Sequence, residues 1–344
     1  MTQRAVLVGI NYIGTSNQLQ GCINDVYRVA DILRTVYKFP SGNITILTDE
    51  EKSFSSLYPT KNNIINALTN LINQTQPGDI AVFHYSGHGT TIKDNTSTDL
   101  IYTNTDDALI PIDVLNRGSY DESRELVDDE LWGIISQVKK GAFLFSAIDA
   151  CHSGSEFDLP YSLHIDPNNK TKYQLEKVER RPETQGAIVM LSGCQTLQTS
   201  LDAVDNTGHP AGALTYALCD YILHHTNDSI HFVDFLCSIR QQIVQHNPGV
   251  PNIQEPQLDF GRVCDAGLTF TLLPNGMAAQ LTDSEQKSVK EILQKVYSAH
   301  VPVIEPKTIQ TPSPRMTNNF SRVRFIEPGL SNMQKFIIKN YYMK

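Results

Sequence analysis

Short runs of apolar residues alternate with stretches of helical periodicity along the first half of the chain. Four runs have the length of a buried strand, at residues 5–10, 44–47, 80–85 and 142–148. Three stretches repeat apolar residues at helical spacing, at residues 24–37, 64–72 behind Thr60 as a possible N-cap, and 128–138. Continuous apolar strands joined by helices are typical of a parallel sheet that is covered on both faces.

The pattern is less regular in the second half. Residues 90–123 read as a long polar loop and residues 157–185 as an exposed, basic linker. A fifth strand is predicted at 187–191, helices at 211–224 and 232–246, and a sixth strand at 268–272. We therefore expect an α/β fold, a sandwich whose central sheet is mostly parallel and six-stranded, with helices on both faces.

From about residue 275 the apolar periodicity weakens. Residues 283–299 could form one amphipathic helix, and the five prolines between residues 301 and 328 favour loose order. We expect residues 275–344 to be a C-terminal extension that is partly helical or disordered.

Composition narrows the functional classes. The chain has 344 residues, 40% hydrophobic and 19% charged, which is typical of a globular protein. Lys and Arg number 28 against 37 Asp and Glu, so the net charge of −9 argues against nucleic acid and against anionic membrane surfaces as partners. No apolar run approaches the ~18 residues of a membrane span, and no signal peptide is evident at the N-terminus. The expected compartment is the cytoplasm or the nucleus, without secretion.

Two strand ends carry unusual residues. The third strand runs into the sequence YSGHG, which ends in His88 and Gly89, and the fourth runs into DACHSG, which contains Cys151. If these strands are parallel neighbours, their ends lie ~5 Å apart and His88 faces Cys151. A thiol beside an imidazole is a nucleophile and base pair. The backbone N–H groups of Gly89 and Cys151 are then candidate oxyanion donors.

Simpler explanations exist for each residue. A cysteine at a strand end is often part of the core, and a histidine is often only hydrogen-bonded. The six cysteines form no C-x-x-C pair, which argues against a zinc ribbon or a thioredoxin-type site. Asp149 lies two residues before Cys151, and Asp25 follows the first strand; two carboxylates near the nucleophile favour a cationic substrate side chain. Asp25 could also cap the first helix, and both roles are possible together.

These motifs resemble one family. YSGHG and DACHSG, with LQGCINDVYR near the N-terminus, are similar to the metacaspases, which are caspase-like cysteine peptidases. SGCQTLQTS, GALTYA and QEPQL resemble the small p10 region of that family. The resemblance implies a peptidase domain over residues 1–274, with a p20-like part at 1–165, a linker at 166–185 and a p10-like part at 186–274. This order is type I-like, without the prodomain of many members.

The resemblance also implies roles for individual residues. Cys151 would be the nucleophile and His88 the general base and acid. The pocket for the substrate residue before the cut bond, P1, would be formed by Cys22, Asp25, Ser86 and Asp149. A calcium site would be formed by Asp106, Asp128, Asp129 and Asp158. Paired aspartates at a helix start also complement the helix dipole, so Asp128 and Asp129 have a purely structural explanation as well.

The sequence therefore predicts a calcium-activated cysteine endopeptidase. Its substrates would be proteins or peptides with Arg or Lys at P1, and it would process itself within residues 166–185. By resemblance we expect a monomer with Ca²⁺ as cofactor. Two alternatives remain open, a catalytically idle caspase-like scaffold and a thiol-based sensor.

Overall fold

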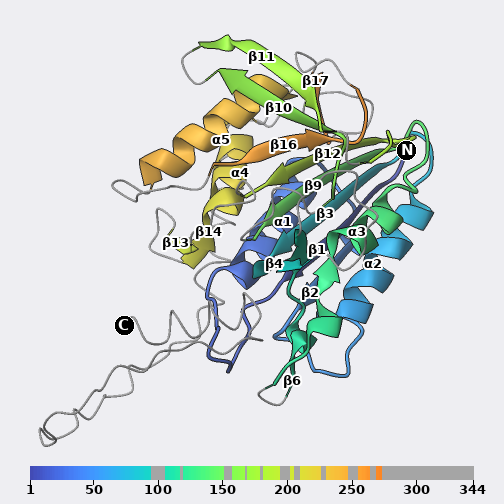
Figure 1. Ribbon diagram of the computed structural model, residues 1–344, viewed down its shortest axis with the longest axis vertical. Helices are drawn as coiled ribbons and strands as arrows, with labels where there is room; N and C mark the ends of the chain where they lie inside the picture. The colour runs from blue at the N-terminus through green and yellow to red at the C-terminus, as the bar shows by residue number, and fades with distance from the viewer. Residues whose placement is uncertain are drawn as a thin grey trace, which may run out of the picture.

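A computed structural model of the chain shows one wide sheet with helices packed against both faces (Figure 1). The structure describes residues 1–93, 105–116, 119–150, 157–166, 169–178, 181–193, 202–204, 210–225, 230–246, 255–263 and 269–272. The predicted extension at 275–344 and Cys151 lie outside these ranges. The central sheet has eight strands in the order β11-β10-β16-β12-β9-β3-β1-β2.

Five neighbouring strands run parallel. They are β2 (Ile44–Thr48), β1 (Gln3–Gly9), β3 (Ile80–Ser86), β9 (Phe143–Asp149) and β12 (Ala187–Ser192). Each corresponds to an apolar run in the sequence. The three innermost strands of this group, β1, β3 and β9, are buried almost throughout. Both faces of such a strand are covered, which explains why its sequence is continuously apolar instead of alternating.

The other side of the sheet is antiparallel, and here the six-stranded prediction is wrong. β16 (Gln257–Phe260) runs antiparallel to β12, β10 (Tyr161–Asp166) runs antiparallel to β16, and β11 (Asn169–Lys177) forms the edge. Residues 161–177 are therefore a hairpin of the sheet and not an extended linker. Polar side chains are tolerated at an exposed sheet edge, which explains the sequence of β11, whereas β16 is buried but only four residues long and so gives a weak apolar signal.

The strand predicted at 268–272 also lies elsewhere. β17 (Thr269–Phe270) pairs with β15 (Ile230–His231) in a separate two-stranded ribbon. Its Phe270 stacks on Phe232 with ring centroids 5.0 Å apart. The apolar character of this segment thus reflects packing against a helix and not membership of the central sheet.

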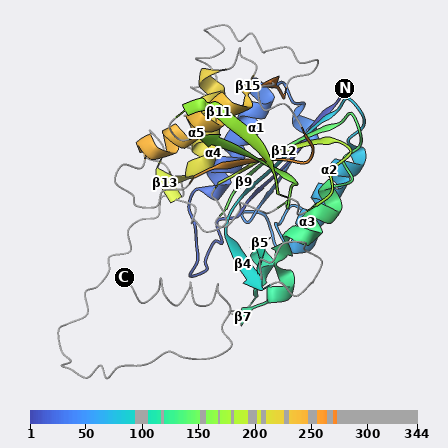
Figure 2. The same cartoon turned by 45° about the horizontal axis from the view of Figure 1, so that its top comes forward.

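Helices cover the two faces of the sheet unequally (Figure 2). α1 (Cys22–Thr35), α4 (Ala213–His224) and α5 (Phe232–His246) share one apolar core, while α2 (Lys61–Gln74) and α3 (Asp128–Ile135) share the other. The predicted cap of α2 is confirmed, because Thr60 Oγ1 accepts a hydrogen bond from the Asn63 N–H at 3.3 Å. No helix in the described ranges combines the length and hydropathy needed to cross a bilayer.

The loop predicted at 90–123 contains short antiparallel structure. β4 (Gly89–Lys93) follows β3 directly and pairs with β5 (Thr105–Leu109), which pairs with β8 (Leu126–Val127). Further short elements are β6 (Leu115–Asn116), β7 (Ser119–Tyr120), β13 (Asp202–Val204), β14 (Pro210–Gly212) and the 3-10 turns Ser41–Asn43, Ile112–Val114 and Glu122–Arg124. The β4–β5–β8 sheet carries the chain from the end of β3 to the start of α3.

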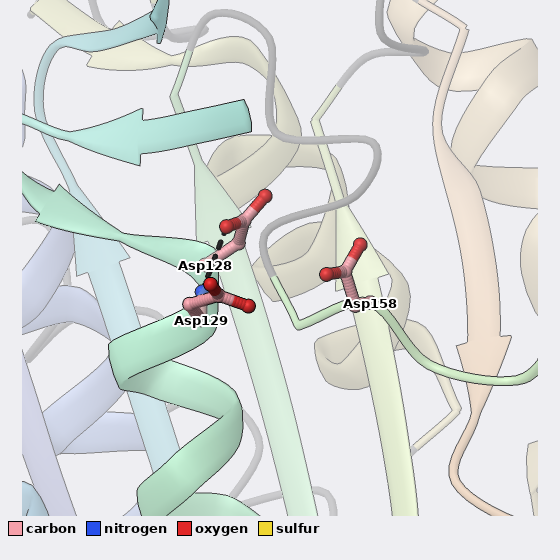
Figure 3. A group of neighbouring side chains, drawn as sticks. All are labelled: Asp128, Asp129 and Asp158. Carbon is pink, nitrogen blue, oxygen red and sulfur yellow. Dashed lines mark hydrogen bonds between the residues drawn. The ribbon is translucent and has the colours of Figure 1, made fainter. Parts of the chain in front are cut away.

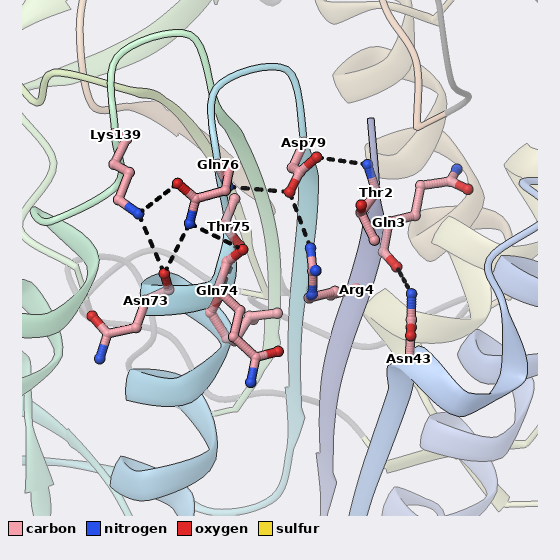
Figure 4. A network of polar contacts seen from close by, with 11 residues as sticks. Thr2, Gln3, Arg4, Asn43, Asn73, Gln74, Thr75, Gln76, Asp79 and Lys139 are labelled. Atoms are coloured by element: carbon pink, nitrogen blue, oxygen red, sulfur yellow. Dashed lines mark hydrogen bonds and ion pairs between the residues drawn. The ribbon is translucent and has the colours of Figure 1, made fainter.

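A polar network joins the strands at the opposite end of the sheet (Figure 4). The Asp79 carboxylate accepts hydrogen bonds from the Thr2 N–H at 2.6 Å and from Arg4 Nη1 at 3.0 Å. Gln76 donates its N–H to the same carboxylate at 3.1 Å and accepts from Lys139 Nζ at 3.0 Å. These contacts tie the starts of β1, β3 and β9 together and leave their carboxyl ends for chemistry.

His84, in the middle of β3, is expected to make stability sensitive to acid. Its side chain is fully buried, Nδ1 donates to the Ala147 carbonyl at 2.9 Å, and Nε2 has no hydrogen-bond partner in the described part of the chain. Burial lowers the pKa of His84 from 6.5 to about 4, against the opposing effect of that hydrogen bond. The unfolded chain therefore takes up a proton first as the pH falls.

Stability should be present above pH 6.5 and decline toward pH 4, with a slope of up to about 1.4 kcal/mol per pH unit from this group. His84→Gln should flatten the decline, as measured by urea unfolding at a series of pH values. Near-ultraviolet circular dichroism at pH 7 is the control for an intact fold. An unchanged slope in the variant would assign the acid sensitivity to other groups.

Candidate active site

The two predicted strand ends are neighbours. β3 and β9 pair in parallel with Ser86 opposite Asp149, and the Gly87 N–H donates to the Asp149 carbonyl at 3.2 Å. In the sequence, His88 and Cys151 each follow two residues after these paired positions. Cys151 itself is outside the ranges that the structure describes. The expectation that these two strand ends share one edge of the sheet is confirmed.

His88 is held in one tautomer. Its Nε2 lies 2.8 Å from the Asn17 carbonyl, which can only accept, so Nε2 carries the proton. In the neutral ring Nδ1 is then an unprotonated acceptor. Burial lowers the pKa of His88, and the hydrogen bond to Asn17 partly opposes this effect. The ring is therefore neutral at physiological pH and can accept a proton at Nδ1, as a general base must.

Tyr12 positions His88, and the sequence reading missed it. The buried Tyr12 hydroxyl accepts the His88 backbone N–H at 2.9 Å and donates to the Ile110 carbonyl at 2.6 Å. Its ring also packs on the imidazole, with centroids 4.5 Å apart. Tyr12 has φ of 53°, which is unusual for a bulky residue and is found where surrounding contacts enforce it. In the sequence, the position of Tyr12 just after the first predicted strand is the only feature that indicates a role at the site.

Asp25 is fully buried in the first turn of α1. Its Oδ2 accepts from Ser86 Oγ at 2.8 Å and from the Gly212 N–H at 2.9 Å. The residue at the helix N-cap is Gly21, and the first N–H groups of the helix, those of Cys22 and Ile23, donate to Asn11 Oδ1 at 3.0 and 3.3 Å. The alternative that Asp25 acts as an N-cap is therefore wrong, and its carboxylate instead joins α1 to the end of β3.

Asp149 lies beside Asp25. Its Oδ2 accepts from the Thr215 N–H and from Thr215 Oγ1, both at 2.8 Å. A Cβ atom added to Gly212 would lie 2.2 Å from Asp149 Oδ2 and 2.8 Å from Asp25 Oδ2, so both carboxylates converge on this glycine. Burial raises the pKa of Asp25, the charge of Asp149 raises it further, and the charge of Arg28 opposes the increase. The site thus holds two crowded carboxylates.

The remaining predicted pocket and oxyanion residues lie at the same edge of the sheet. Cys22 is buried at the start of α1, one turn before Asp25, and its N–H donates to Asn11 Oδ1 at 3.0 Å. Gly89 is buried at the start of β4, directly after His88. The structure therefore brings Cys22, Asp25, Ser86 and Asp149 to one end of the sheet.

A second acidic group lies at the start of α3 (Figure 3). Asp128, Asp129 and Asp158 each offer a carboxylate oxygen, and these oxygens lie within 4.8 Å of one another. Asp128 and Asp158 are buried, and Asp158 has φ of 45°. Asp106, on β5, is buried but does not belong to this group of three.

Electrostatic repulsion is strong in this acidic cluster, which we define as Asp128, Asp129 and Asp158. Burial and, after it, the charge of Asp158 together raise the pKa of Asp128 to about 9, although the Asp107 N–H, 3.0 Å from Asp128 Oδ2, opposes the increase. The charge of Asp106 also raises the pKa of Asp128, so Asp106 lies near the acidic cluster. Clustered carboxylate oxygens are the donors that Ca²⁺ prefers, so this set fits a hard divalent cation.

The fold and the site together define an α/β protein with a candidate active site at the carboxyl ends of its parallel strands, and comparison with known proteins identifies the family. The family model for the metacaspase peptidase C14 domain matches residues 3–160. Metacaspase-2 from Trypanosoma brucei brucei (strain 927/4 GUTat10.1) is 31% identical over 281 residues, covering 79% of this chain and 76% of the relative. The chain belongs to the metacaspase family.

Other relatives are longer than this chain. Metacaspase-5 from Trypanosoma cruzi (strain CL Brener) is 31% identical over 285 residues, and the match covers 78% of this chain but 60% of that protein. For Metacaspase-2 from Arabidopsis thaliana, 35% identical over 229 residues, the shares are 64% and 52%. The chain thus spans about half to three fifths of these two relatives.

Among solved structures, a protein from Geobacter sulfurreducens has a TM-score of 0.54 and 21% identity, with 80% of this chain and 99% of that chain covered. This likeness concerns the fold alone.

Gly212 is expected to tolerate no side chain. Gly212→Ala forces a methyl group into the two carboxylates, so we expect a loss of about 1–3 kcal/mol in the free energy of unfolding. Gly133→Ala is the matched control, because Gly133 lies in α3 and an added Cβ there meets nothing within 4 Å. That change should be neutral or stabilising by up to about 1 kcal/mol. Equal stability of both variants, measured by urea unfolding, would contradict the convergence on Gly212.

Proposed function

We propose that this protein is a calcium-activated cysteine endopeptidase that cleaves peptide bonds after Arg or Lys. The observation that carries the proposal is the convergence of Asp25 and Asp149 on Gly212, beside a histidine held as a base at the adjoining strand end. Membership of a peptidase family supports the reaction class. The proposal extends to self-processing within residues 166–185.

The chemistry follows from the tautomer of His88. Nδ1 of His88 would take the proton of the Cys151 thiol, and the thiolate would attack the carbonyl carbon of the scissile bond. The oxyanion that forms would accept hydrogen bonds from the N–H groups of Gly89 and Cys151. His88 would then return the proton to the leaving amine. Water, deprotonated by His88, would hydrolyse the resulting thioester and regenerate the thiol.

The preference for a basic P1 residue follows from the crowded carboxylates. Without a substrate cation, burial and the charge of Asp149 favour a protonated Asp25, and the charge of Arg28 opposes this only in part. A guanidinium or ammonium group would relieve this repulsion and donate hydrogen bonds to two ionised carboxylates. A neutral or acidic P1 side chain would leave the repulsion in place, so it should be rejected.

A calcium ion would supply positive charge that binds the acidic cluster and orders the segments that carry its ligands. Asp128 and Asp129 begin α3, Asp158 precedes β10, and Asp106 is on β5. Asp158 follows Cys151 by seven positions in the sequence, so an ion bound at Asp158 would restrain the chain close to the proposed nucleophile. Magnesium is smaller and holds its water more tightly, so it should substitute poorly.

The remaining elements of the proposal concern partners and place. We propose action on protein or peptide substrates with a basic P1 residue, as a monomer, in the cytoplasm or nucleus. Exposed charges on the edge strand β11, at Lys172, Glu176 and Lys177, support the monomer, because charged edges resist pairing with another sheet.

Peptide hydrolysis with paired substrates tests catalysis and specificity together. Two peptides that differ only in Arg or its neutral isostere citrulline at P1 should differ by about 100-fold in kcat/KM, because the buried carboxylates pair only with the charge. Asp149→Asn should reduce that ratio toward one. Cys151→Ala and His88→Ala should abolish both reactions, and Cys151→Ala should remain a single band on a gel.

The failures of this test are informative. Full hydrolysis by Cys151→Ala would assign the nucleophile elsewhere. Equal rates on the Arg and citrulline peptides would contradict the acidic pocket. A wild-type protein without hydrolysis at any calcium concentration would favour the idle scaffold.

Calcium dependence has its own test. Asp128→Ala combined with Asp129→Ala should leave a folded protein whose peptide hydrolysis no longer increases across a calcium titration, because two of the proposed ligands are lost. Asp121→Ala is the control, since Asp121 is an aspartate of the exposed turn before α3 and outside the acidic cluster. Superimposable titrations of the double variant and the wild type would leave the aspartates with only their role at the helix start.

A further inference from the structure

The acidic cluster already contacts a cation that belongs to the chain. Arg181 lies beyond β11, and its guanidinium binds two of the three clustered carboxylates. Nη2 of Arg181 donates to Asp158 Oδ2 at 2.9 Å, and Nε donates to the same oxygen at 3.3 Å. Nη2 also donates to Asp129 Oδ1. An arginine therefore partly neutralises the oxygens that a metal ion would use.

This contact is well enclosed. The Arg181 side chain is 12% exposed, and its guanidinium carbon lies 5.9 Å from the ring centroid of Trp132, on the same helix as Asp129. The backbone that follows is anchored, because the Thr184 N–H donates to the Gly261 carbonyl at 2.7 Å and the Gly186 N–H to the Val138 carbonyl at 3.0 Å. A surface ion pair without such burial would contribute little.

A guanidinium and a divalent cation cannot both use these oxygens. Ca²⁺ needs 6–8 oxygen ligands at about 2.3–2.6 Å, so it would require Asp129 and Asp158 directly. A positive guanidinium left in place would also repel the ion at close range. The ion carries twice the charge and gains from all the carboxylates at once. Binding of the ion should therefore displace Arg181.

We propose that Arg181 is a resident counter-ion of the acidic cluster, and that calcium binds only when Arg181 leaves. The inference rests on the proposed calcium site and adds the residue that sets its threshold. Arg181 would also couple calcium binding to self-processing, because it ends the basic sequence KVERR at 177–181, within the proposed self-processing segment. Calcium would release this segment for cleavage, and Arg181 would lower the apparent calcium affinity by holding the competing state.

Calcium binding measured by titration calorimetry tests the proposal without relying on activity. All chains carry Cys151→Ala to prevent self-cleavage. Arg181→Gln should bind calcium about 10-fold more tightly than the parent chain, because the competing state is lost. Arg181→Lys, which keeps the charge but not the planar fork, should lie between the two. Arg124→Gln is the matched control, because Arg124 also pairs with two aspartates, Asp113 at 2.8 Å and Asp121 at 3.0 Å, and should leave the affinity unchanged.

Thermal unfolding and limited trypsin digestion give independent readouts. With chelator present, Arg181→Gln should have a lower Tm than the parent, because its carboxylates lose their counter-ion, and the gain in Tm on adding calcium should be larger. Calcium should speed trypsin cleavage after Lys177 and Arg180 in the parent, whereas Arg181→Gln should be cut rapidly with or without it.

The outcomes separate this inference from the proposed function. Equal or weaker calcium binding by Arg181→Gln, with binding still lost in the Asp128→Ala, Asp129→Ala chain, would overturn the role of Arg181 and leave the calcium site intact. No binding heat in any chain would overturn both. Tighter binding in the Arg124→Gln control as well would attribute the effect to net charge and refute a specific competitor.

Discussion

The parallel pairing of β3 with β9 is the constraint on which the site depends. It places Ser86 opposite Asp149 and so brings together the two chain segments that leave these strands toward His88 and Cys151. Both strands are buried on both faces, so a slip by one residue would turn every side chain to the opposite core. The hydrogen bond from Ser86 Oγ to Asp25 then links this register to α1. The hydrogen bond between Ser86 and Asp25 therefore depends on this register of β3 and β9, and a different register would break it.

The same molecule keeps carboxylates close together at two separate places, and it offsets their repulsion differently. In the pocket, hydrogen-bond donors from Ser86, Gly212 and Thr215 hold Asp25 and Asp149, with Arg28 opposing the increase in the pKa of Asp25. At the acidic cluster, the Arg181 guanidinium takes part of that role. Under the proposed function, the crowded pair Asp25 and Asp149 would accept a substrate cation in addition to Arg28, whereas calcium would have to displace Arg181 from the acidic cluster. On that proposal, the first site would serve substrate recognition and the second would serve control by calcium.

Much of the candidate site followed from strand-end motifs. His88 and Asp149 were identifiable because parallel strands deliver their carboxyl ends to one edge, and the structure places them there, whereas Ser86 was assigned only through the family resemblance. The location of the acidic cluster was available only through family resemblance, because adjacent aspartates at a helix start have an ordinary structural explanation. Tyr12 was missed for a physical reason: its hydroxyl meets a backbone N–H that is 76 positions away in the chain. A local pattern cannot express such a contact.

The sequence by itself determined the five parallel strands and the helices between them, because a strand buried on both faces must be apolar throughout and an amphipathic helix must repeat. Only the tertiary structure decided the rest of the sheet. β10, β11 and β16 are short or polar, and their place depends on antiparallel partners far away in the chain, so they could not be told from a linker. The pairing of Arg181 with Asp129 and Asp158 likewise depends on residues that are far apart in the chain. A basic residue in a polar stretch is ordinarily solvated, and only the folded chain brings this one to two carboxylates that repel each other in its absence.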